Sequence, residues 1–179
     1  MAFGLFAERG FAGTTLYDIA AALGVGRRTV LRYYPSKNDI PWGQFSETLQ
    51  GFADLLDQMP LHLPLHEAVH RGVLAFNTFP EAAVDSHRER MRLILTTPEL
   101  QSHSVQQYAA WRSVVARYVA RRTGRPERDM LPQLVGRVSL ALALSAYDTW
   151  LEAGDRPLLE CIDAAMGELR WYIRSDLAP

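Results

Sequence analysis

The stretch from Gly10 to Lys37, GFAGTTLYDIAAALGVGRRTVLRYYPSK, decides the fold of this chain. Thr15 is a good N-cap for a helix over Leu16–Ala22, because its hydroxyl can accept a hydrogen bond from the third-position amide. Asp18 stands at that third position, where its carboxylate can close a capping box. Gly24 can adopt the left-handed conformation that ends such a helix. A short capped helix followed by a tight turn is therefore predicted.

A second short helix is predicted over Arg27–Tyr33, and it ends because Pro35 disfavours the helical conformation for the residue before it. Val30 is expected to face the core, while Val25 and Tyr34 are expected to help anchor the two ends of this helix. Two helices joined by a tight glycine turn, of which the second is short and basic, are typical of a helix-turn-helix motif.

The second helix also carries the residues that are expected to contact DNA. An α-helix fits the major groove, and arginine can pair bidentately with guanine, so Arg28 and Arg32 are predicted to read bases. Thr15, Tyr33 and Lys37 are predicted to bind phosphates. The alternative interpretation is a solvated basic face on an ordinary helix. The full set of predicted DNA-binding residues is Thr15, Gly26, Arg27, Arg28, Thr29, Arg32, Tyr33 and Lys37.

Short motifs in and around this stretch resemble the TetR family of transcriptional regulators. They are AERGF at Ala7–Phe11, TT at 14–15, DIA at 18–20, LGV at 23–25 and YYPSK at 33–37. Within that family, RRTVLRYYPSKNDIPWG at Arg27–Gly43 is most similar to the regulators found beside mycofactocin biosynthesis genes. These motifs cover the first quarter of the chain.

The resemblance implies an all-α fold with a helix-turn-helix DNA-binding head at residues 1–37 and a helical ligand-binding and dimerisation body at residues 38–179. It also implies a homodimer that binds a palindromic operator in double-stranded DNA, with the last two helices of each copy forming the interface. In this family small effectors bind in the body, and for the narrower group the expected effector is an amphipathic metabolite such as an acyl-coenzyme A. Repression is the expected mode of action, and no cofactor is expected.

The residues before the helix-turn-helix predict an apolar first helix that ends at Gly10, with Phe6 and Phe11 placed to touch across the break. In the TetR family this helix is usually longer and follows a basic arm, whereas here it begins almost at Met1. Either the natural start lies upstream, or the phosphate contacts of such an arm are missing.

The remainder of the chain has the pattern of an all-helical body. Ser36 and Asp39 can form a capping box for a helix that is expected to be irregular near Pro41 and to run to Met59. Further helices are predicted over 65–78, 81–96, 99–123, 128–153 and 157–176. No segment alternates apolar and polar residues between turn signals, so no strand is predicted.

Composition fits a globular protein with one substantial core, or with a small head and a larger body. The chain has 179 residues, of which 48% are hydrophobic and 22% charged, and its net charge is −1. Residues 1–40 hold five basic and three acidic side chains (+2), which leaves fourteen basic and seventeen acidic ones (−3) for the rest. The single cysteine, Cys161, excludes an internal disulfide. With no signal peptide and no run of eighteen apolar residues, a cytoplasmic protein without a membrane partner is expected.

Aromatic residues of the middle helices suggest a second site, a cavity for an apolar or amphipathic ligand. The alternative is that they simply fill the core. The predicted ligand-binding residues are Phe52, Phe76, Phe79, Tyr108, Trp111 and Tyr118.

His62, His66 and His70 recur every four residues and would suggest a metal site in an all-helical enzyme. However, Pro64 interrupts the helix before His66, so only one i, i+4 pair remains and no metal is predicted. The sequence also has no nucleophile elbow and no phosphate-binding glycine loop, so catalysis is not expected. Besides this enzyme, the remaining alternative to a regulator is a helical binding or signalling module that no longer contacts DNA.

Overall fold

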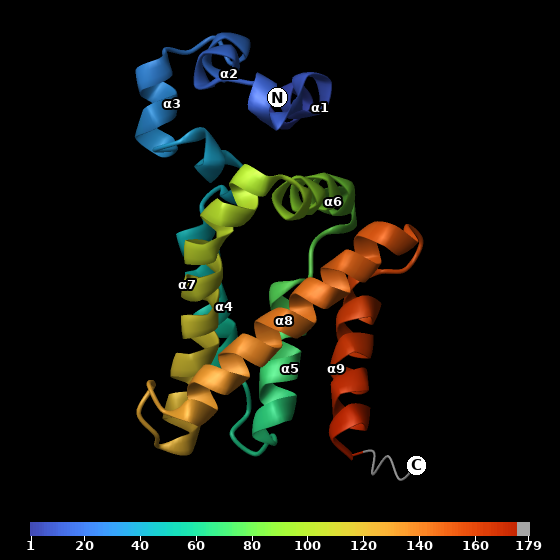
Figure 1. The fold of residues 1–179 in the computed structure, drawn as a ribbon. Helices are drawn as coiled ribbons and strands as arrows, with labels where there is room; N and C mark the ends of the chain where they lie inside the picture. Colours follow the sequence, from blue (N-terminus) through green and yellow to red (C-terminus); the bar gives the residue numbers. More distant parts are fainter. Residues whose placement is uncertain (175–179) are drawn as a thin grey trace. The chain divides into compact units, whose positions relative to one another are not determined.

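The computed structural model describes residues 1–174, and the regular structure in this part of the chain is entirely helical (Figure 1). This confirms the all-α expectation. In chain order the elements are α1 (Ala2–Gly13), α2 (Leu16–Ala22), α3 (Arg27–Tyr33), the 3-10 helix η1 (Lys37–Trp42), α4 (Phe45–Asp57), α5 (Leu65–Phe76), α6 (Glu81–Thr96), α7 (Pro98–Thr123), α8 (Met130–Ala153) and α9 (Leu158–Arg174). The last two residues of the helix predicted over 157–176 lie outside the described residues.

The chain folds into two compact units, and each is formed by two separate segments. The head unit consists of Met1–Phe45 and Ala82–Val105, and the body unit consists of Ser46–Glu81 and the chain from Gln106 onward. The expected division after residue 37 follows sequence order, whereas these units do not. Almost all of α6 and the beginning of α7 belong to the head unit, together with the three N-terminal helices.

Side chains from both segments form the core of the head unit. Phe6 and Phe11 of α1 lie with ring centroids 5.0 Å apart, as the sequence predicts. Ile19 of α2 and Ile40 of η1 join the same buried cluster. Leu100, near the start of α7, is completely buried in this cluster. The second segment is therefore part of the head core and not an appendage to it.

The chain around the predicted helix ends departs from α-helical geometry at glycine and proline. Gly10 has φ 73° and breaks α1 where expected, although one more turn follows it. The irregularity expected near Pro41 is confirmed, because residues 37–42 form the 3-10 helix η1. The helix does not continue from there to Met59, since Gly43, with φ 58°, ends η1 and α4 begins at Phe45. Pro41 has no amide hydrogen, so an α-helical hydrogen-bond pattern cannot run through this turn.

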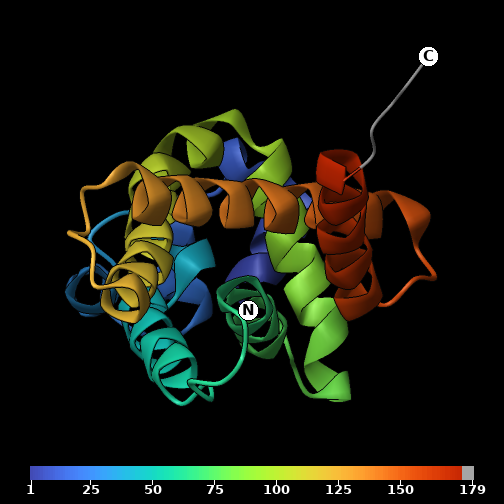
Figure 2. The same ribbon diagram turned by 90° about the horizontal axis from the view of Figure 1, so that it is seen from below.

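The body unit is organised around α8, which lies against both α5 and α9. Seen from below, α9 runs across the C-terminal part of α8 (Figure 2). Helices α7 and α8 approach closely because Gly136 has no side chain, and a Cβ there would lie 2.7 Å from the carbonyl oxygen of Arg112. A buried polar link joins α8 to the end of α5, where the Tyr147 hydroxyl donates to Asn77 Oδ1 at 2.7 Å. Burial raises the pKa of Tyr147 well above its usual value, so this hydroxyl remains a donor.

Candidate nucleic-acid interface

The turn between α2 and α3 has the geometry that the sequence predicts. Gly24 has φ 66°, and the amide of Val25 donates to the carbonyl of Ala20 at 3.0 Å, which is the wide hydrogen bond of a Schellman motif. Ile19 and Ala20 on α2 and Val30 on α3 are buried, so one side of each helix is fixed in the head core. Val25 is 40% exposed, and the expectation that it anchors α3 is wrong, because backbone hydrogen bonds hold the turn instead.

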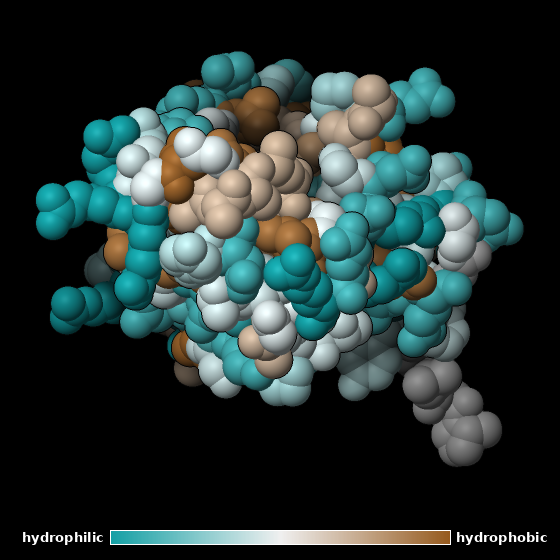
Figure 3. Space-filling model, turned by 90° about the horizontal axis from the view of Figure 1, so that it is seen from above, coloured by the Kyte–Doolittle hydropathy of each residue, from teal (hydrophilic) through white to brown (hydrophobic). Residues whose placement is uncertain are grey.

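The outer side of α3 is open and carries most of the predicted DNA-binding residues. Arg27 and Arg28 are exposed, Thr29 is half-buried, and Tyr33 is 66% exposed. Gly26, the N-cap of α3, is also exposed and has no side chain that would obstruct a phosphate backbone. Long hydrophilic side chains project on the side where α3 lies (left in Figures 1 and 3).

The last turn of α3 combines a cation and an aromatic ring in one surface. The guanidinium of Arg32 lies over the ring of Tyr33, 5.0 Å from its centroid, and donates to the Tyr33 hydroxyl at 3.3 Å. This stacking limits the directions in which the guanidinium can point. Arg32 and Tyr33 therefore form one joint surface, and neither is an independent flexible side chain.

Thr15 forms the capping box predicted at the start of α2. Its hydroxyl accepts from the amide of Asp18 at 3.2 Å and donates to the Asp18 carboxylate at 2.5 Å, and its own amide donates to the same carboxylate at 2.8 Å. These bonds from Thr15, with Arg9 3.5 Å away, hold the pKa of Asp18 below its usual value. The hydroxyl hydrogen of Thr15 is thus already used within the head, and its contact with a phosphate stays a prediction.

Lys37 is placed differently from the other predicted DNA-binding residues. Its side chain is half-buried, and its ammonium donates to the carbonyls of Phe11 at 2.6 Å and Thr14 at 2.9 Å. The same nitrogen lies 4.3 Å from the centroid of the Phe11 ring. Two of its three N–H donors are therefore bound to the end of α1.

One exposed aromatic residue of the head was not singled out in the sequence. Tyr17 on α2 is 72% exposed, although tyrosine at a helical position usually suggests core. The signal that marks it is its register, because it lies two positions before Ile19 and so falls outside the buried stripe of α2. Its side chain is available beside the helix-turn-helix.

The structure brings Phe52, Phe76 and Trp111, which are predicted to bind a ligand, into one aromatic cluster. The ring of Phe52 lies 4.6 Å from that of Phe76 and 5.2 Å from that of Trp111, measured between centroids. The other three predicted ligand-binding residues are Phe79, Tyr108 and Tyr118. The Tyr118 hydroxyl accepts from the guanidinium of Arg122 at 2.7 Å. The three rings fill space against one another, with Phe52 stacked on Trp111 and Phe76 edge-on to Trp111, and ligand binding by this group stays a prediction.

The histidines considered as metal ligands are separated from one another. His62 and His66 are exposed, whereas His70 is buried, with Nε2 3.0 Å from the Asp163 carboxylate and Nδ1 accepting from the Arg170 guanidinium. Burial, and then the charge of Arg170, lowers the pKa of His70. Within residues 1–174, no group of three or more His, Cys, Asp or Glu side chains is placed to hold a metal ion.

Comparison with known proteins agrees with this geometry. Residues 1–40 match the family of bacterial regulatory proteins, tetR family, and residues 63–172 match the MftR C-terminal domain. The chain is 48% identical over 161 residues to the putative mycofactocin biosynthesis transcriptional regulator MftR of Mycobacterium tuberculosis (strain ATCC 25618 / H37Rv), covering 90% of this chain and 81% of that protein. It is 27% identical over 180 aligned positions to the HTH-type transcriptional regulator TcmR of Streptomyces glaucescens, covering 97% of this chain and 79% of that protein.

Solved structures with low sequence identity share the fold. The crystal structure of Thermus thermophilus FadR, a TetR family transcriptional repressor in complex with lauroyl-CoA, matches with a TM-score of 0.62 and 21% identity, covering 99% of this chain and 95% of that chain. A putative tetR family regulator from Shewanella sp. PV-4 matches with a TM-score of 0.59 and 21% identity, covering 96% and 93%. Both the head and most of the body thus match known relatives, and the chain belongs to the TetR family of transcriptional regulators.

Proposed function

We propose that this protein acts in the cytoplasm as a homodimeric, ligand-responsive repressor that binds a palindromic DNA operator and is not an enzyme. The observation that carries the proposal is the exposed, cationic outer side of α3 on a helix-turn-helix whose inner side is buried. The two heads of a dimer of this kind bind half-sites about one helical turn of DNA apart. Membership of a family of transcriptional regulators supports the same assignment.

Within the head, α3 is the helix that enters the major groove. Arg28 is the base-reading residue, because it is exposed on α3 and, unlike Arg32, is not stacked on a neighbouring ring. Arg27 and the joint surface of Arg32 and Tyr33 then face the DNA on either side of it. Gly26 lets the backbone at the start of α3 approach a phosphate closely.

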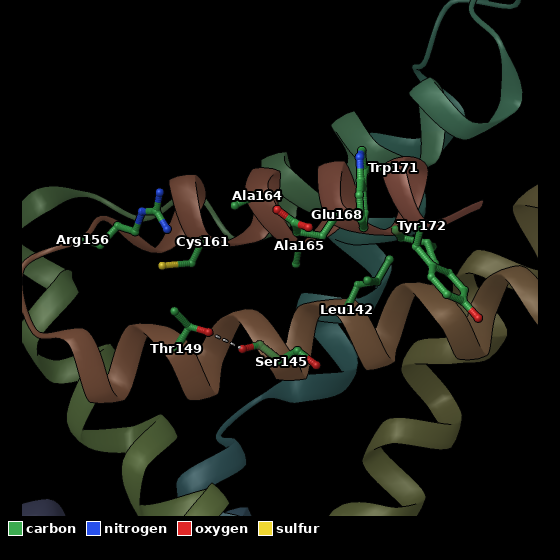
Figure 4. A pocket seen from close by; sticks show the side chains of 11 residues that line it. Leu142, Ser145, Thr149, Arg156, Cys161, Ala164, Ala165, Glu168, Trp171 and Tyr172 are labelled. Carbon is green, nitrogen blue, oxygen red and sulfur yellow. Dashed lines mark hydrogen bonds between the residues drawn. The ribbon is translucent and has the colours of Figure 1, made fainter. Parts of the chain in front are cut away.

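The outer side of α8 and α9 is the proposed dimer interface. A groove of about 580 Å³ lies between these helices, with Leu142 and Ser145 of α8 facing Ala165 of α9, and exposed Trp171 and Tyr172 stand at its end (Figure 4). By length and composition α8 could also cross a membrane, a test that core helices of soluble proteins pass as well. An apolar helix face against a second copy accounts for the same composition.

The effector is proposed to be an amphipathic metabolite such as an acyl-coenzyme A, bound in the body unit. The FadR structure with lauroyl-CoA, which has the same fold, supports this class of ligand. The clustered rings of Phe52, Phe76 and Trp111 are the proposed apolar contacts. Such a ligand can release DNA only to the extent that it binds the DNA-free conformation more tightly than the DNA-bound one.

The test is a gel-shift experiment with DNA from upstream of the protein's own gene. Wild-type protein should bind as a dimer, and Arg28→Ala should lose about 1–3 kcal/mol of binding free energy at one base position and relax the preference there. Arg117→Ala, which changes an exposed arginine of the body unit, is the matched control and should bind as wild type does. If Arg28→Ala kept the base preference of wild type, as Arg117→Ala is expected to do, Arg28 would not be part of the DNA interface. Folded wild-type protein that binds acyl-coenzyme A but no DNA would instead support the alternative of a binding module.

A further inference from the structure

Lys37 is the only lysine among the 19 basic residues of the chain, the other eighteen being arginine. The side chain crosses from η1 to the end of α1, where two backbone carbonyls receive its hydrogen bonds at 2.6 Å and 2.9 Å. Its third side is covered by the Phe11 ring. An ammonium is a compact point charge with three donors, whereas a guanidinium is a planar fork that suits carboxylates and phosphates. The site therefore fits lysine and not arginine.

The carbonyls at this corner need partners because α1 ends there. The last carbonyls of a helix have no partner within the helix and carry a partial negative charge. Thr14 is completely buried, and its hydroxyl lies 2.9 Å from the carbonyl of Gly10 and 3.2 Å from that of Leu5. Lys37 supplies donors to the carbonyls of Phe11 and Thr14. The side chains of Thr14 and Lys37 thus lie within hydrogen-bonding distance of four backbone carbonyls at this corner.

The backbone from which the Lys37 side chain extends is also held by hydrogen bonds. Asp39 accepts from the amide of Ser36 at 2.8 Å and from its hydroxyl at 2.7 Å, which closes a capping box around Lys37 and Asn38. The second carboxylate oxygen of Asp39 lies 2.9 Å from Nε2 of His103, on α7 in the second segment of the head unit. The backbone of Lys37, only four residues after the end of α3, is therefore held from two sides.

We propose that Lys37 is an internal clamp that ties the end of α3 to the end of α1, and that it positions the DNA-reading helix without contacting a phosphate. Its effect on DNA binding rests on the proposed function, whereas the clamp itself does not. The proposal reverses the role that the sequence predicts for this residue.

The clamp can be tested without DNA because the chain has one lysine. An ammonium held by two carbonyls reacts with an acylating reagent only after local opening, so Lys37 of native protein should react at least about tenfold more slowly than in urea-unfolded protein. In Lys37→Met, amide hydrogen exchange of residues 10–18 should become faster, while Arg27→Met should leave it unchanged. Equal lysine reactivity in native and unfolded protein, or unchanged exchange in Lys37→Met, would overturn the clamp.

The salt dependence of DNA binding separates a clamp from a phosphate contact. Each phosphate contact that is lost lowers the slope of log K against log salt by about 0.9, or by about 1.8 for the two heads of a dimer. With DNA from upstream of its own gene, Lys37→Met should bind at least about tenfold more weakly than wild type but with an unchanged slope, whereas Arg27→Met should lose slope.

Each other outcome has a definite meaning. A reduced slope in Lys37→Met with unchanged hydrogen exchange would show that Lys37 is a phosphate ligand and would overturn the proposal. Faster exchange with unchanged affinity would show a structural bond with no positioning role. If Lys37 were a phosphate ligand, Lys37→Arg would keep the charge and so restore both slope and affinity. Under the clamp it should restore neither the affinity nor the protection of residues 10–18. If wild type bound no DNA at all, the proposed function would fail, and the reactivity and exchange measurements would still decide the clamp.

Discussion

Two contacts in this molecule are held by opposite means. One is the corner at the end of α1 in the head, to which Lys37 of η1 donates, and the other is the contact between α7 and α8 in the body. At the corner, short polar side chains and one ammonium satisfy the free backbone groups at helix ends. Where α7 meets α8, the absence of a side chain at Gly136 lets one helix backbone approach the other. The first kind of contact is sensitive to charge and hydrogen bonding, whereas the second is sensitive to volume.

The contact in the body should give the largest effect when it is broken. Gly136→Ala places a methyl group 2.7 Å from the carbonyl oxygen of Arg112, a backbone atom that cannot move without shifting α7. We expect the free energy of unfolding to fall by about 3 kcal/mol, at the upper end of what overpacking costs. Urea unfolding followed by circular dichroism measures this change.

The matched control for this substitution is Gly51→Ala on α4, where an added Cβ meets no atom within 4 Å. Alanine is the better helix former, so this variant should be more stable than wild type by about 0.5–1 kcal/mol. If Gly136→Ala were as stable as Gly51→Ala, close packing would not be what holds α7 against α8.

Acid should weaken the protein through histidines whose pKa is lowered by partial or full burial. In the head unit, burial and then the charge of Arg90 lower the pKa of His87 to about 4. An unfolded histidine titrates near 6.5, so between these values the unfolded chain binds more protons and stability falls as the pH falls. The free energy of unfolding should drop on the order of 2 kcal/mol between pH 6.5 and pH 4.5 from this residue.

Urea unfolding at a series of pH values measures the contribution of His87. His87→Gln should make the dependence on pH shallower but should not abolish it, because the pKa of His70 in the body unit is lowered too. Identical curves for His87→Gln and wild type would contradict the assignment.

The N-cap of α2 should give the smallest of these effects. Thr15→Ala removes the hydroxyl of the capping box, and the free energy of unfolding should fall by about 1 kcal/mol. Thr15→Ser keeps the hydroxyl and should retain most of the stability. A loss of DNA affinity in Thr15→Ala beyond what its stability explains would favour the predicted phosphate contact.

Local signals predicted the helices of this chain well. Thr15 with Asp18, Ser36 with Asp39, and Gly24 marked helix starts and a turn that the structure reproduces, because capping acts between residues that are close in sequence. The family signature extended this to the assignment of the chain to the TetR family, which the comparisons confirm.

What could not be predicted depends on contacts between distant segments. Nothing near Lys37 in the sequence shows that carbonyls 23 and 26 residues earlier would take its hydrogen bonds. The same holds for Leu100, which completes a core that the N-terminal helices begin. Val25 is apolar and was expected to anchor α3, but a turn held by its backbone leaves the side chain half exposed.

The two-segment construction of the head has a consequence for building hybrid regulators. A crossover placed after residue 45 would separate Ile40 from Leu100 and Asp39 from His103. One placed after residue 37 would instead separate Phe6, Phe11 and Ile19 from both Ile40 and Leu100. The head core of this protein would then have to pack against the α6 and α7 of the recipient, whose side chains differ from its own. Transplanting operator recognition from this protein therefore calls for two grafts, residues 1–45 and 82–105, moved together as one matched pair.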